Sequence, residues 1–364
     1  MSSFAVTAER LTIHPHPNAD ALELAQVGLY RAVVGKGIYE TGDWSIYIPE
    51  QAILPESLIE ELGLTGRLAG KNHDRVKAIR LRGELSQGIV CRPKALHDIL
   101  GPGGVFDGDD LETCAERGVD FAPLLGITKW VPEIPTHMAG VMVEAPDLLR
   151  WVDIENIKRF PDIFAPGEPV VATEKVHGTC CLTTVTAAGE TLVTSKGFGG
   201  KGLAIAESDS NVYWRAVRAH KVAEFAADLI GVYGASRVGV FGEVYGSGVQ
   251  DLGYGVNAGV EPGYAAFDIA IDVPGEGVSW VSPALFPNRG PATVPVLYEG
   301  PYDEALLLDL AEGKTVLGAG AHIREGVVVR PAAERFSPVT GSRAIGKFVS
   351  GAYLTRKGAT TEFE

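Results

Sequence analysis

Cysteines are few in this 364-residue chain, and they do not form the patterns that indicate a metal or redox site. No two of them have the C-x-x-C spacing that a zinc knuckle or a redox pair uses. They are Cys91, Cys114, Cys180 and Cys181. Apolar runs long enough to cross a bilayer are missing, and the first ten residues lack the apolar core of a signal peptide. The sequence therefore predicts a cytoplasmic protein in a reducing compartment, with no membrane partner.

Positive charge is also scarce. The chain has 32 lysines and arginines against 46 aspartates and glutamates, which gives a formal net charge of −14. Nonspecific binding to nucleic acid normally rests on clustered basic side chains. Two stretches are locally basic: residues 195–221 hold five basic and two acidic residues, and residues 71–82 hold five basic residues and one acidic residue. Since such runs are more often solvated faces than binding sites, they permit nucleic-acid binding without predicting it.

Length and composition are those of a globular protein. The chain is about twice the usual size of a domain, so two compact units are expected. Hydrophobic residues make up 46% and charged residues 21%, which argues against an intrinsically disordered chain. The 45 glycines indicate many turns or places where backbone approaches a ligand. We find no internal repeat and no low-complexity tract.

The first third of the chain reads as short strands separated by turns. Strands are expected at Ala25–Val34, Trp44–Ile48 and Arg75–Leu81, and a helix at Pro55–Leu62. Several short strands with one helix are typical of a small barrel. The proline-bearing stretch that follows, Trp130–Met138, has no periodicity and reads as a linker.

The second part of the chain contains apolar, β-rich runs that end at charged residues. A helix is expected at Asn211–Leu229, where apolar residues recur at helical spacing. The expected strands are Val170–Glu174, Thr191–Ser195, Arg237–Glu243, Tyr264–Ile271 and Gly326–Arg330. Antiparallel sheets with helices between them are the natural interpretation. We therefore expect a first domain at residues 1–130, a linker at 131–140 and a second domain at 141–364.

Two segments of the first domain resemble the tRNA-binding OB-fold domain. His14–Glu23, with Val27 and Gly28 after it, is similar to the start of that module, and Leu81–Ile89 is similar to its end. OB-folds bind single strands with a barrel face and its loops. The resemblance implies that the first domain grips RNA. Turn formation explains part of the pattern as well, because Pro15 and Asn18 are turn residues.

One lysine lies where a covalent nucleotide could form. Lys175 stands in Thr173–Thr179, between an apolar run and a glycine turn. An amine attacks phosphorus only when it is deprotonated, and the ordinary lysine pKa of about 10.4 makes that form rare at neutral pH. Desolvation, neighbouring cations or a bound metal can each lower the pKa, so a strand end beneath a nucleotide is a sensible place for such a lysine.

Lys175 is followed by further segments in a fixed order, and together they resemble the covalent nucleotidyltransferase superfamily of polynucleotide ligases and capping enzymes. The similarity is greatest to its RNA ligase branch. The segments are Lys175–Gly178, Ser195–Lys196, Phe241–Glu243, Tyr264–Ile269, Glu325–Pro331 and Ala344–Leu354. His177 replaces the usual aspartate, a form that is similar to that of some bacterial template-dependent RNA ligases, and its role is left open. Only one lysine, Lys347, stands where many relatives carry two.

The resemblance implies a role for each matched residue. Lys175 would bind ATP and attack its α-phosphorus, and Lys347 would contact the α-phosphate. Glu325 would act in catalysis and hold a divalent metal, Mg²⁺ or Mn²⁺, with Glu243 as a second metal-binding carboxylate. The remaining expected nucleotide-binding residues are Glu174, Gly178, Lys196, Glu243 for the ribose, and Phe267 for stacking on the base. Lys196 in a hairpin and Phe267 in a core also have ordinary structural explanations.

These features predict an α+β protein, with an OB-like β-barrel followed by an ATP-grasp-like ligase domain of antiparallel sheets and flanking helices. The resemblance implies an ATP-dependent RNA ligase. It would join a 3′-hydroxyl to a 5′-phosphate through lysyl-AMP and an adenylylated 5′ end, in RNA repair at nicks. DNA ligases and capping-type guanylyltransferases generally carry their OB-fold after the last motif, where only 17 residues follow Lys347 here. Those enzymes, and a noncatalytic RNA-binding relative, stay open as alternatives, and the sequence does not indicate an oligomeric state.

Overall fold

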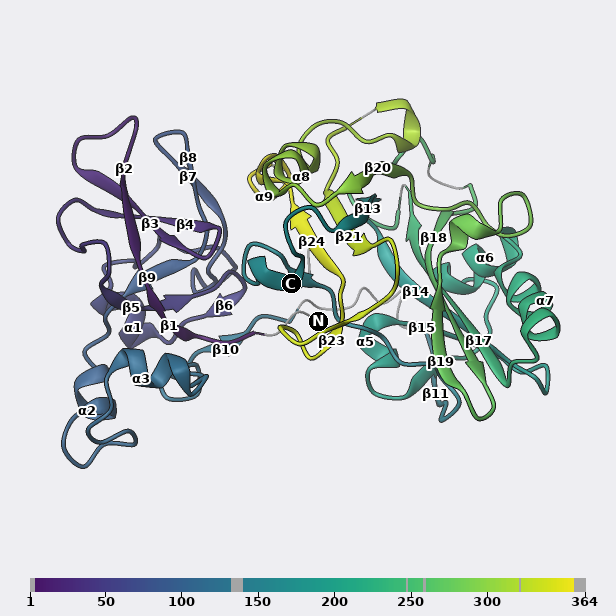
Figure 1. Ribbon diagram of the computed structural model, residues 1–364, viewed down its shortest axis with the longest axis horizontal. Helices are drawn as coiled ribbons and strands as arrows, with labels where there is room; N and C mark the ends of the chain where they lie inside the picture. The colour runs from purple at the N-terminus through teal and green to yellow at the C-terminus, as the bar shows by residue number, and fades with distance from the viewer. Residues whose placement is uncertain (1–3, 132–139, 247, 258–259, 321, 357–364) are drawn as a thin grey trace. The chain divides into compact units, whose positions relative to one another are not determined.

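The chain forms two compact units. The computed structural model describes residues 4–131, 140–246, 248–257, 260–320 and 322–356. Unit 1 comprises Met1–Pro132, Ile154–Ile163 and Leu354–Glu364, and unit 2 comprises Glu133–Asp153 and Phe164–Tyr353. Most of the linker expected at 131–140 lies outside the described residues. Figure 1 shows the elements of each unit.

Unit 1 contains a small β-barrel. One antiparallel sheet has the order β1-β5-β9 and another has the order β2-β3-β4. The apolar side chains between them include Leu11, Tyr30 and Tyr47, all of which are buried. The strands of unit 1 are β1 (Thr7–Arg10), β2 (Thr12–Pro15), β3 (Leu22–Val27), β4 (Tyr30–Gly35), β5 (Trp44–Ile48), β6 (Ala52–Ile53), β7 (Ile79–Leu81), β8 (Glu84–Ser86), β9 (Ile89–Cys91), β10 (Thr128–Lys129) and β12 (Glu155–Asn156).

A second apolar cluster of unit 1 lies beneath β1 and β5 and includes Ile46, Leu58 and Phe121. Three short helices contribute to it: α1 (Glu56–Glu61), α2 (Leu96–Leu100) and α3 (Leu111–Glu116). The 3₁₀ helix η1 (Pro161–Ile163) also belongs to unit 1. The helix expected at 55–62 and the strand expected at 44–48 are confirmed. The barrel with its added helices is the arrangement that the strand-rich pattern of residues 4–125 predicts.

Two strand predictions in unit 1 are wrong in detail. The strand expected at 25–34 is a hairpin of β3 and β4, because the chain reverses at Gly28 in a left-handed conformation with φ of 55°. A Cβ at Gly28 would lie 2.7 Å from the carbonyl oxygen of Lys158, so only glycine fits there. The strand expected at 75–81 narrows to β7, with an isolated bridge at Arg75.

Unit 2 is built around two antiparallel sheets. Its larger sheet has seven strands in the order β11-β16-β15-β14-β17-β18-β19, and its second sheet contains β24-β21-β13-β20 in that order. The strands are β11 (Met142–Glu144), β13 (Pro169–Lys175), β14 (Thr179–Thr186), β15 (Thr191–Ser195), β16 (Leu203–Ile205), β17 (Arg237–Tyr245), β18 (Gly263–Val273), β19 (Gly277–Val281), β20 (Val296–Pro301), β21 (Gly326–Pro331), β22 (Phe336–Ser337), β23 (Ser342–Arg343) and β24 (Gly346–Val349). Five of these contain the strands expected from sequence.

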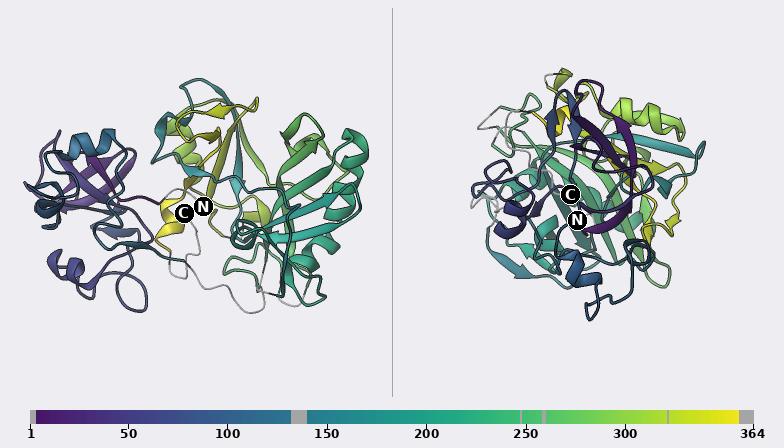
Figure 2. Two further views of the ribbon diagram at one scale, coloured as in Figure 1. Left: turned by 90° about the horizontal axis from the view of Figure 1, so that it is seen from below. Right: turned by 90° about the vertical axis from the view of Figure 1, so that its left-hand side faces the viewer.

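Helices cover one face of the seven-stranded sheet. The apolar side of α6 (Val212–Ala219) packs on β15, β17 and β18, and that of α7 (Val222–Tyr233) packs on β14, β17 and β18 (Figures 1 and 2). The single helix expected at 211–229 is therefore wrong. It is broken at Lys221, which adopts a left-handed conformation with φ of 53°. The other helices are α5 (Lys196–Gly199), α8 (Glu304–Ala311), α9 (Gly351–Leu354), η2 (Pro283–Leu285) and η3 (Leu317–Gly320).

The observed α+β architecture confirms the predicted fold class. No helix in the described part of the chain is long and apolar enough to cross a membrane. Because α6 and α7 bury one face of the seven-stranded sheet, the functional side chains of β14, β17 and β18 emerge from the other face. Cys180, Leu182, Phe241 and Glu243 alternate with the helix-facing residues and share that second face.

Candidate active site

The predicted nucleophile ends a strand of the smaller sheet. Lys175 is the last residue of β13 and pairs with Gly326 of β21. Residues 176–178 then connect β13 to β14 of the seven-stranded sheet. Gly178 is required in this turn, because a Cβ there would lie 2.2 Å from the carbonyl oxygen of Val244. The turn from one sheet to the other therefore brings the lysine to the edge shared by the two sheets.

Glu325 forms a close ion pair with Lys175. Its Oε1 lies 2.6 Å from Nζ of the lysine. The side chain of Lys175 is 21% exposed, whereas that of Glu325 is 3% exposed. Glu325 immediately precedes β21, and the adjoining Gly326 permits tight packing because a Cβ there would lie 2.1 Å from the carbonyl oxygen of Phe348. The structure thus brings together two predicted site residues that are 150 positions apart.

Glu243 is the second carboxylate near Lys175. It is buried on β17, directly opposite Cys180 of β14, and Cys180 Sγ donates a hydrogen bond to its Oε2 at 3.3 Å. Burial raises the pKa of Glu243 to about 8, the ammonium of Lys175 opposes this shift, and the charge of Glu325 adds to it. The raised pKa means that the neighbouring ammonium group does not fully compensate the cost of burying the ionised carboxylate. The site would therefore gain from an added cation or hydroxyl donor.

Lys196 lies near the same group of charged side chains, as its effect on the pKa of Cys180 indicates. Burial raises the pKa of its thiol, Glu243 raises it further, and Lys196 and Lys175 both oppose the shift. Lys196 begins α5 directly after β15, and its Nζ lies 3.1 Å from Oδ1 of Asp153. Both lysines are therefore close enough to Cys180 to influence its charge.

Lys347 emerges from the same face of the smaller sheet as Lys175. The register of β13, β21 and β24 aligns Thr173, Val328 and Lys347 across three neighbouring strands. Directly paired residues of antiparallel strands share a face, and Lys175 is two residues along β13 from Thr173. Lys347 is 4% exposed, so its ammonium group is held within unit 2 rather than in bulk water.

His177, which replaces the aspartate of the usual motif, is a buried hydrogen-bond junction. Its Nε2 lies 2.7 Å from Oδ1 of Asp251, and its Nδ1 lies 2.8 Å from the hydroxyl of Tyr353. Its backbone N–H donates to the hydroxyl of Tyr254 at 2.6 Å. Nδ1 also lies 4.0 Å from Oε2 of Glu325. The histidine therefore ties the turn after Lys175 to distant segments.

Glu174 lies on the other side of β13 from Lys175, as strand alternation requires. It is 1% exposed, and its carboxylate accepts hydrogen bonds from the hydroxyl of Thr315 and, at 2.8 Å, from the backbone N–H of Val316. Those contacts attach the 315–316 segment to β13. The structure thus brings Glu325 and Glu243 to Lys175, whereas Glu174 faces away from it.

Phe267, the residue expected to stack on the base, is the extra residue of a β-bulge. Phe241 pairs with Asp268 and Gly242 pairs with Ala266, so Phe267 has no partner on β17. It is half-buried and packs between two apolar clusters, one containing Leu182 and Phe241, the other Val176 and Tyr254. The bulge turns this ring out of the regular alternation of β18, next to the strand that carries Glu243.

The donor set at Lys175 fits a divalent metal. Among the described residues no cluster of three or more His, Cys, Asp or Glu side chains could enclose an ion alone. Glu325 and Glu243 nevertheless supply carboxylate oxygens, the hard ligands that Mg²⁺ and Mn²⁺ favour, and phosphate oxygens and water can complete such a site.

Sequence reasoning missed several residues that shape this site. Cys180, Asp251, Tyr254, Thr315 and Tyr353 were not identified. For Cys180 a signal was present, since alternation along Thr179–Val185 places it on the face of Leu182 rather than of Cys181. Asp251 had none, because it lies outside the regular strands and reaches His177 from 74 positions away. Tyr353 lies in the matched segment Ala344–Leu354, but nothing in that segment indicated a contact with His177, 176 positions away.

An OB barrel and a two-sheet unit with a half-buried lysine beside buried carboxylates at the sheet junction define a nucleotidyltransferase of the ligase type. Residues 168–349, half of the chain, match the family model described as RNA ligase, and residues 5–93 match a model described as an OB-fold domain. The chain therefore belongs to the RNA ligase family, a family of ATP-dependent nucleotidyltransferases. No curated protein matches the chain.

Solved structures of Naegleria gruberi RNA ligase share the fold over nearly the whole chain. The enzyme with pyrophosphate is 21% identical, with 97% of this chain and 98% of that chain covered and a TM-score of 0.74. A variant of it with ATP and manganese is 22% identical over 96% and 98% of the two chains, also with a TM-score of 0.74. At this identity the likeness shows the fold alone, and it confirms the predicted order of the two domains.

Proposed function

We propose that this RNA ligase joins a 3′-hydroxyl to a 5′-phosphate through an AMP covalently bound to Lys175. The observation that carries the proposal is the buried group at the sheet junction, where Nζ of Lys175 lies 2.6 Å from Glu325 and within the electrostatic influence of Glu243. An amine held between carboxylates in a largely dry site is positioned for chemistry rather than for solvation.

In the first step Lys175 attacks the α-phosphorus of ATP. A bond forms between Nζ and phosphorus, the bond from phosphorus to the bridging oxygen breaks, and pyrophosphate leaves with that oxygen. Glu325 is close enough to hold the proton that Nζ loses. Lys347 would neutralise charge on the α-phosphate. When bound through Glu325 and Glu243, a divalent ion would neutralise phosphate charge as well.

The later steps use the adenylate. The 5′-phosphate of the RNA takes AMP from Lys175, and the 3′-hydroxyl then attacks that phosphate and releases AMP. Lys196, near Cys180, would bind polynucleotide phosphates. Glu243 would accept from the ribose and Phe267 would stack on the adenine, which is worth about 1–3 kcal/mol per base. Gly178 leaves room for the close approach of the backbone, whereas the contacts of Glu174 indicate that it supports the site from the far side of β13.

ATP and a divalent metal are the expected cofactors, and RNA is the expected partner. Variants of Naegleria gruberi RNA ligase have been solved with ATP or AMP together with manganese, which supports these assignments. The OB barrel in front of the catalytic unit supports a role at nicks in duplex RNA, in the manner of bacterial template-dependent repair ligases. All four cysteines are free, which fits a cytoplasmic location.

Labelling with ATP tests the proposal. Wild-type protein incubated with α-³²P-ATP and Mg²⁺ or Mn²⁺ should acquire one labelled AMP that survives denaturation, and Lys175→Ala should acquire none. Unlabelled wild-type protein under both metals would contradict the mechanism. A nick-sealing assay with RNA or DNA at the 3′-hydroxyl side then separates an RNA ligase from a DNA ligase. Labelling by GTP instead of ATP would indicate a capping-type enzyme.

A further inference from the structure

Three short segments of unit 1 lie side by side and carry one group of basic and aromatic side chains. Arg75 forms an antiparallel bridge with Ile53 of β6, and Ile53 pairs with Thr128 of β10. The backbone of Gln51, which lies just before β6, connects the other two segments. Its backbone N–H donates to the carbonyl of Val76 at 3.0 Å, and its carbonyl accepts from the backbone N–H of Trp130 at 2.8 Å.

The register places Arg75, Lys77 and Trp130 on one face of these segments. Arg75 and Thr128 are aligned through Ile53, so their side chains lie on one face. Lys77 lies two residues after Arg75 and Trp130 two residues after Thr128, and alternation in extended backbone puts both on that same face. The guanidinium of Arg75 confirms the arrangement, since its central carbon lies 4.1 Å from the centre of the Trp130 ring. All three side chains are half-buried. We call these three residues the Trp130 platform.

The platform carries two positive charges, and neither cation forms a close ion pair among the described residues. In the part of the chain that the structure describes, no carboxylate lies within 4.0 Å of the ammonium of Lys77 or the guanidinium of Arg75. Partial burial lowers the pKa of Lys77, and the nearby Arg75 and Arg356 lower it further, against a weaker opposing effect of Glu50. Burial also lowers the pKa of Arg75, against a weaker opposing effect of the neighbouring Asp74. An arriving anion would relieve both the desolvation and the repulsion between like charges.

The combination of side chains indicates what kind of anion fits. Phosphates of a nucleic-acid backbone pair with lysine and arginine, and unpaired bases stack on aromatic rings or on arginine planes. A guanidinium lying on an indole offers both contacts at once, which a small inorganic anion would not use. The half-buried ring and the cations on one face are the features that single-strand binding proteins combine.

Resting on the proposed function, in which this chain acts on RNA, we propose that the Trp130 platform binds an unpaired stretch of the RNA strand. Lys77 and Arg75 contact neighbouring phosphates, and the stack of Arg75 on Trp130 carries a base. The contact is independent of base sequence, because neither phosphates nor ring faces distinguish the bases.

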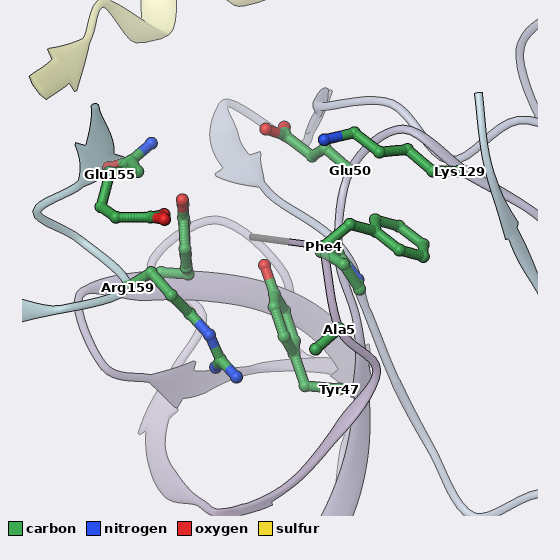
Figure 3. Close-up of a pocket in the computed structure, with 10 residues that line it drawn as sticks. Phe4, Ala5, Tyr47, Glu50, Lys129, Glu155 and Arg159 are labelled. Carbon is green, nitrogen blue, oxygen red and sulfur yellow. The ribbon is translucent and has the colours of Figure 1, made fainter. Parts of the chain in front are cut away.

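A hollow with a cavity volume of about 40 Å³ in unit 1 is the alternative place for RNA (Figure 3). Its walls include Phe4 and Tyr47, but its two cations, Lys129 and Arg159, are matched by the carboxylates of Glu50 and Glu155. Figure 3 shows Glu50 and Lys129 side by side at its upper edge. Arg159 is also paired with Glu9 at 2.6 Å. The hollow therefore lacks the surplus positive charge that makes the platform favourable for phosphate.

Binding of the full-length chain to a fluorescein-labelled, unstructured 12-nucleotide RNA tests the platform. Fluorescence anisotropy at several salt concentrations gives the affinity and its salt slope. Lys77→Ala should weaken binding several-fold and reduce the slope by about 0.7, the value for one phosphate contact on a single strand. Trp130→Ala should weaken binding about fivefold or more, with most of the affinity kept in Trp130→Phe, because the aromatic ring supports the stack that carries the base.

Two further variants make the result decisive. Arg75→Lys keeps the charge but loses the flat stack, so it should weaken binding while leaving the salt slope close to wild type. Lys94→Ala removes an equal charge from an exposed lysine outside the platform, and it should leave the slope unchanged. Thermal unfolding confirms that each variant is folded. Folded Lys77→Ala and Trp130→Ala proteins with the wild-type affinity and slope would overturn the platform.

Lysyl-AMP formation by the wild-type chain is measured beside RNA binding. If the wild type is labelled and the platform variants bind RNA normally, the platform is wrong and the proposed ligase mechanism stands. If the wild type is not labelled, the ligase mechanism fails whatever the RNA affinities are.

Discussion

The hydroxyl of Tyr353 lies 2.8 Å from Nδ1 of His177, although the two residues are 176 positions apart in the chain. Both side chains are almost fully buried. Since Nε2 of the same ring lies 2.7 Å from Asp251, one neutral tautomer satisfies both contacts: Nε2–H donates to the carboxylate and Nδ1 accepts from the tyrosine. The residue two positions after the proposed nucleophile is thereby held from two sides.

Tyr353→Phe should therefore weaken the turn that carries Lys175. Losing one buried hydrogen bond costs about 1 kcal/mol of unfolding free energy, and His177 Nδ1 is left without this donor. We expect that loss in urea unfolding, together with slower lysyl-AMP formation. Tyr233→Phe is the matched control, because Tyr233 is 40% exposed on α7, and it should change neither quantity. If the two variants have the same unfolding free energy and the same rate of lysyl-AMP formation, the hydrogen bond between Tyr353 and His177 does not stabilise the turn.

His177→Asp should be more harmful than His177→Asn, even though aspartate is the residue of the usual motif. A carboxylate near the present position of Nδ1 would lie about 4.0 Å from Glu325 and would also be close to Asp251, with little access to water. An additional buried negative charge costs on the order of 2 kcal/mol or more. Unfolding free energies and the rate of Lys175 labelling measure the difference.

A second substitution isolates the charge effect. His177→Asp combined with Asp251→Asn should recover part of the lost stability, because one of the two competing negative charges is removed. If His177→Asp alone labels as well as the wild type, the histidine is exchangeable here and the neighbouring acidic residues have no bearing on it.

The sequence predicted the order of the two domains and most of the strands because apolar alternation and turn residues are local signals. The helix expected at 211–229 and the strand expected at 25–34 were wrong because the chain turns at one residue with a positive φ in each. Lys221 has a left-handed φ that its residue type does not announce, and the helix expected at 211–229 divides there. At Gly28 the glycine was visible, but its turn depends on the backbone of Lys158, 130 positions later.

The sequence predicted several residues of the site but not how they are arranged. Lys175, Glu243 and Glu325 were predictable because the first two close apolar strand-like runs and the third opens one, in a familiar order. Their mutual distances were not, since register across β13 and β21 sets one and the pairing of β14 with β17 sets the other. His177 was visible as a departure from the motif, but its partners Asp251 and Tyr353 lie 74 and 176 positions away, and no local pattern reveals those contacts.

Gly178→Ala should damage the site through backbone packing alone. The added Cβ would lie 2.2 Å from the carbonyl oxygen of Val244 and 3.1 Å from Cγ of Glu243, so the strands β14 and β17 would have to separate. Overpacking of this kind costs about 1–3 kcal/mol, and we expect labelling of Lys175 to fall with it. Gly231→Ala in α7 is the control.

At Gly231 a Cβ would meet nothing within 4 Å, and alanine favours a helix over glycine by about 1 kcal/mol. That variant should be more stable than the wild type and label normally. Unchanged stability and labelling in Gly178→Ala would show that the turn tolerates a side chain.

The ion pair of Glu168 with Arg335 should make part of the stability of unit 2 depend on acidity. Nε and the terminal nitrogen of Arg335 lie 2.6 and 2.8 Å from the two carboxylate oxygens, and this pairing holds the pKa of Glu168 below its usual value. Since the folded pKa is the lower one, the stabilisation is present above the unfolded value of about 4.3 and is lost as pH falls through the folded pKa.

Glu168→Gln should therefore lower the unfolding free energy by about 0.5–1 kcal/mol at pH 7, because the pair is partly exposed, by a similar amount at pH 5, and by less at pH 4 and pH 3. Urea unfolding at pH 7, 5, 4 and 3 measures the difference from the wild type. Glu276→Gln is the matched control, since that carboxylate is exposed and forms no ion pair among the described residues. A destabilisation by Glu168→Gln that stays constant from pH 7 to pH 3 would mean that lost packing, rather than the charge pair, is responsible.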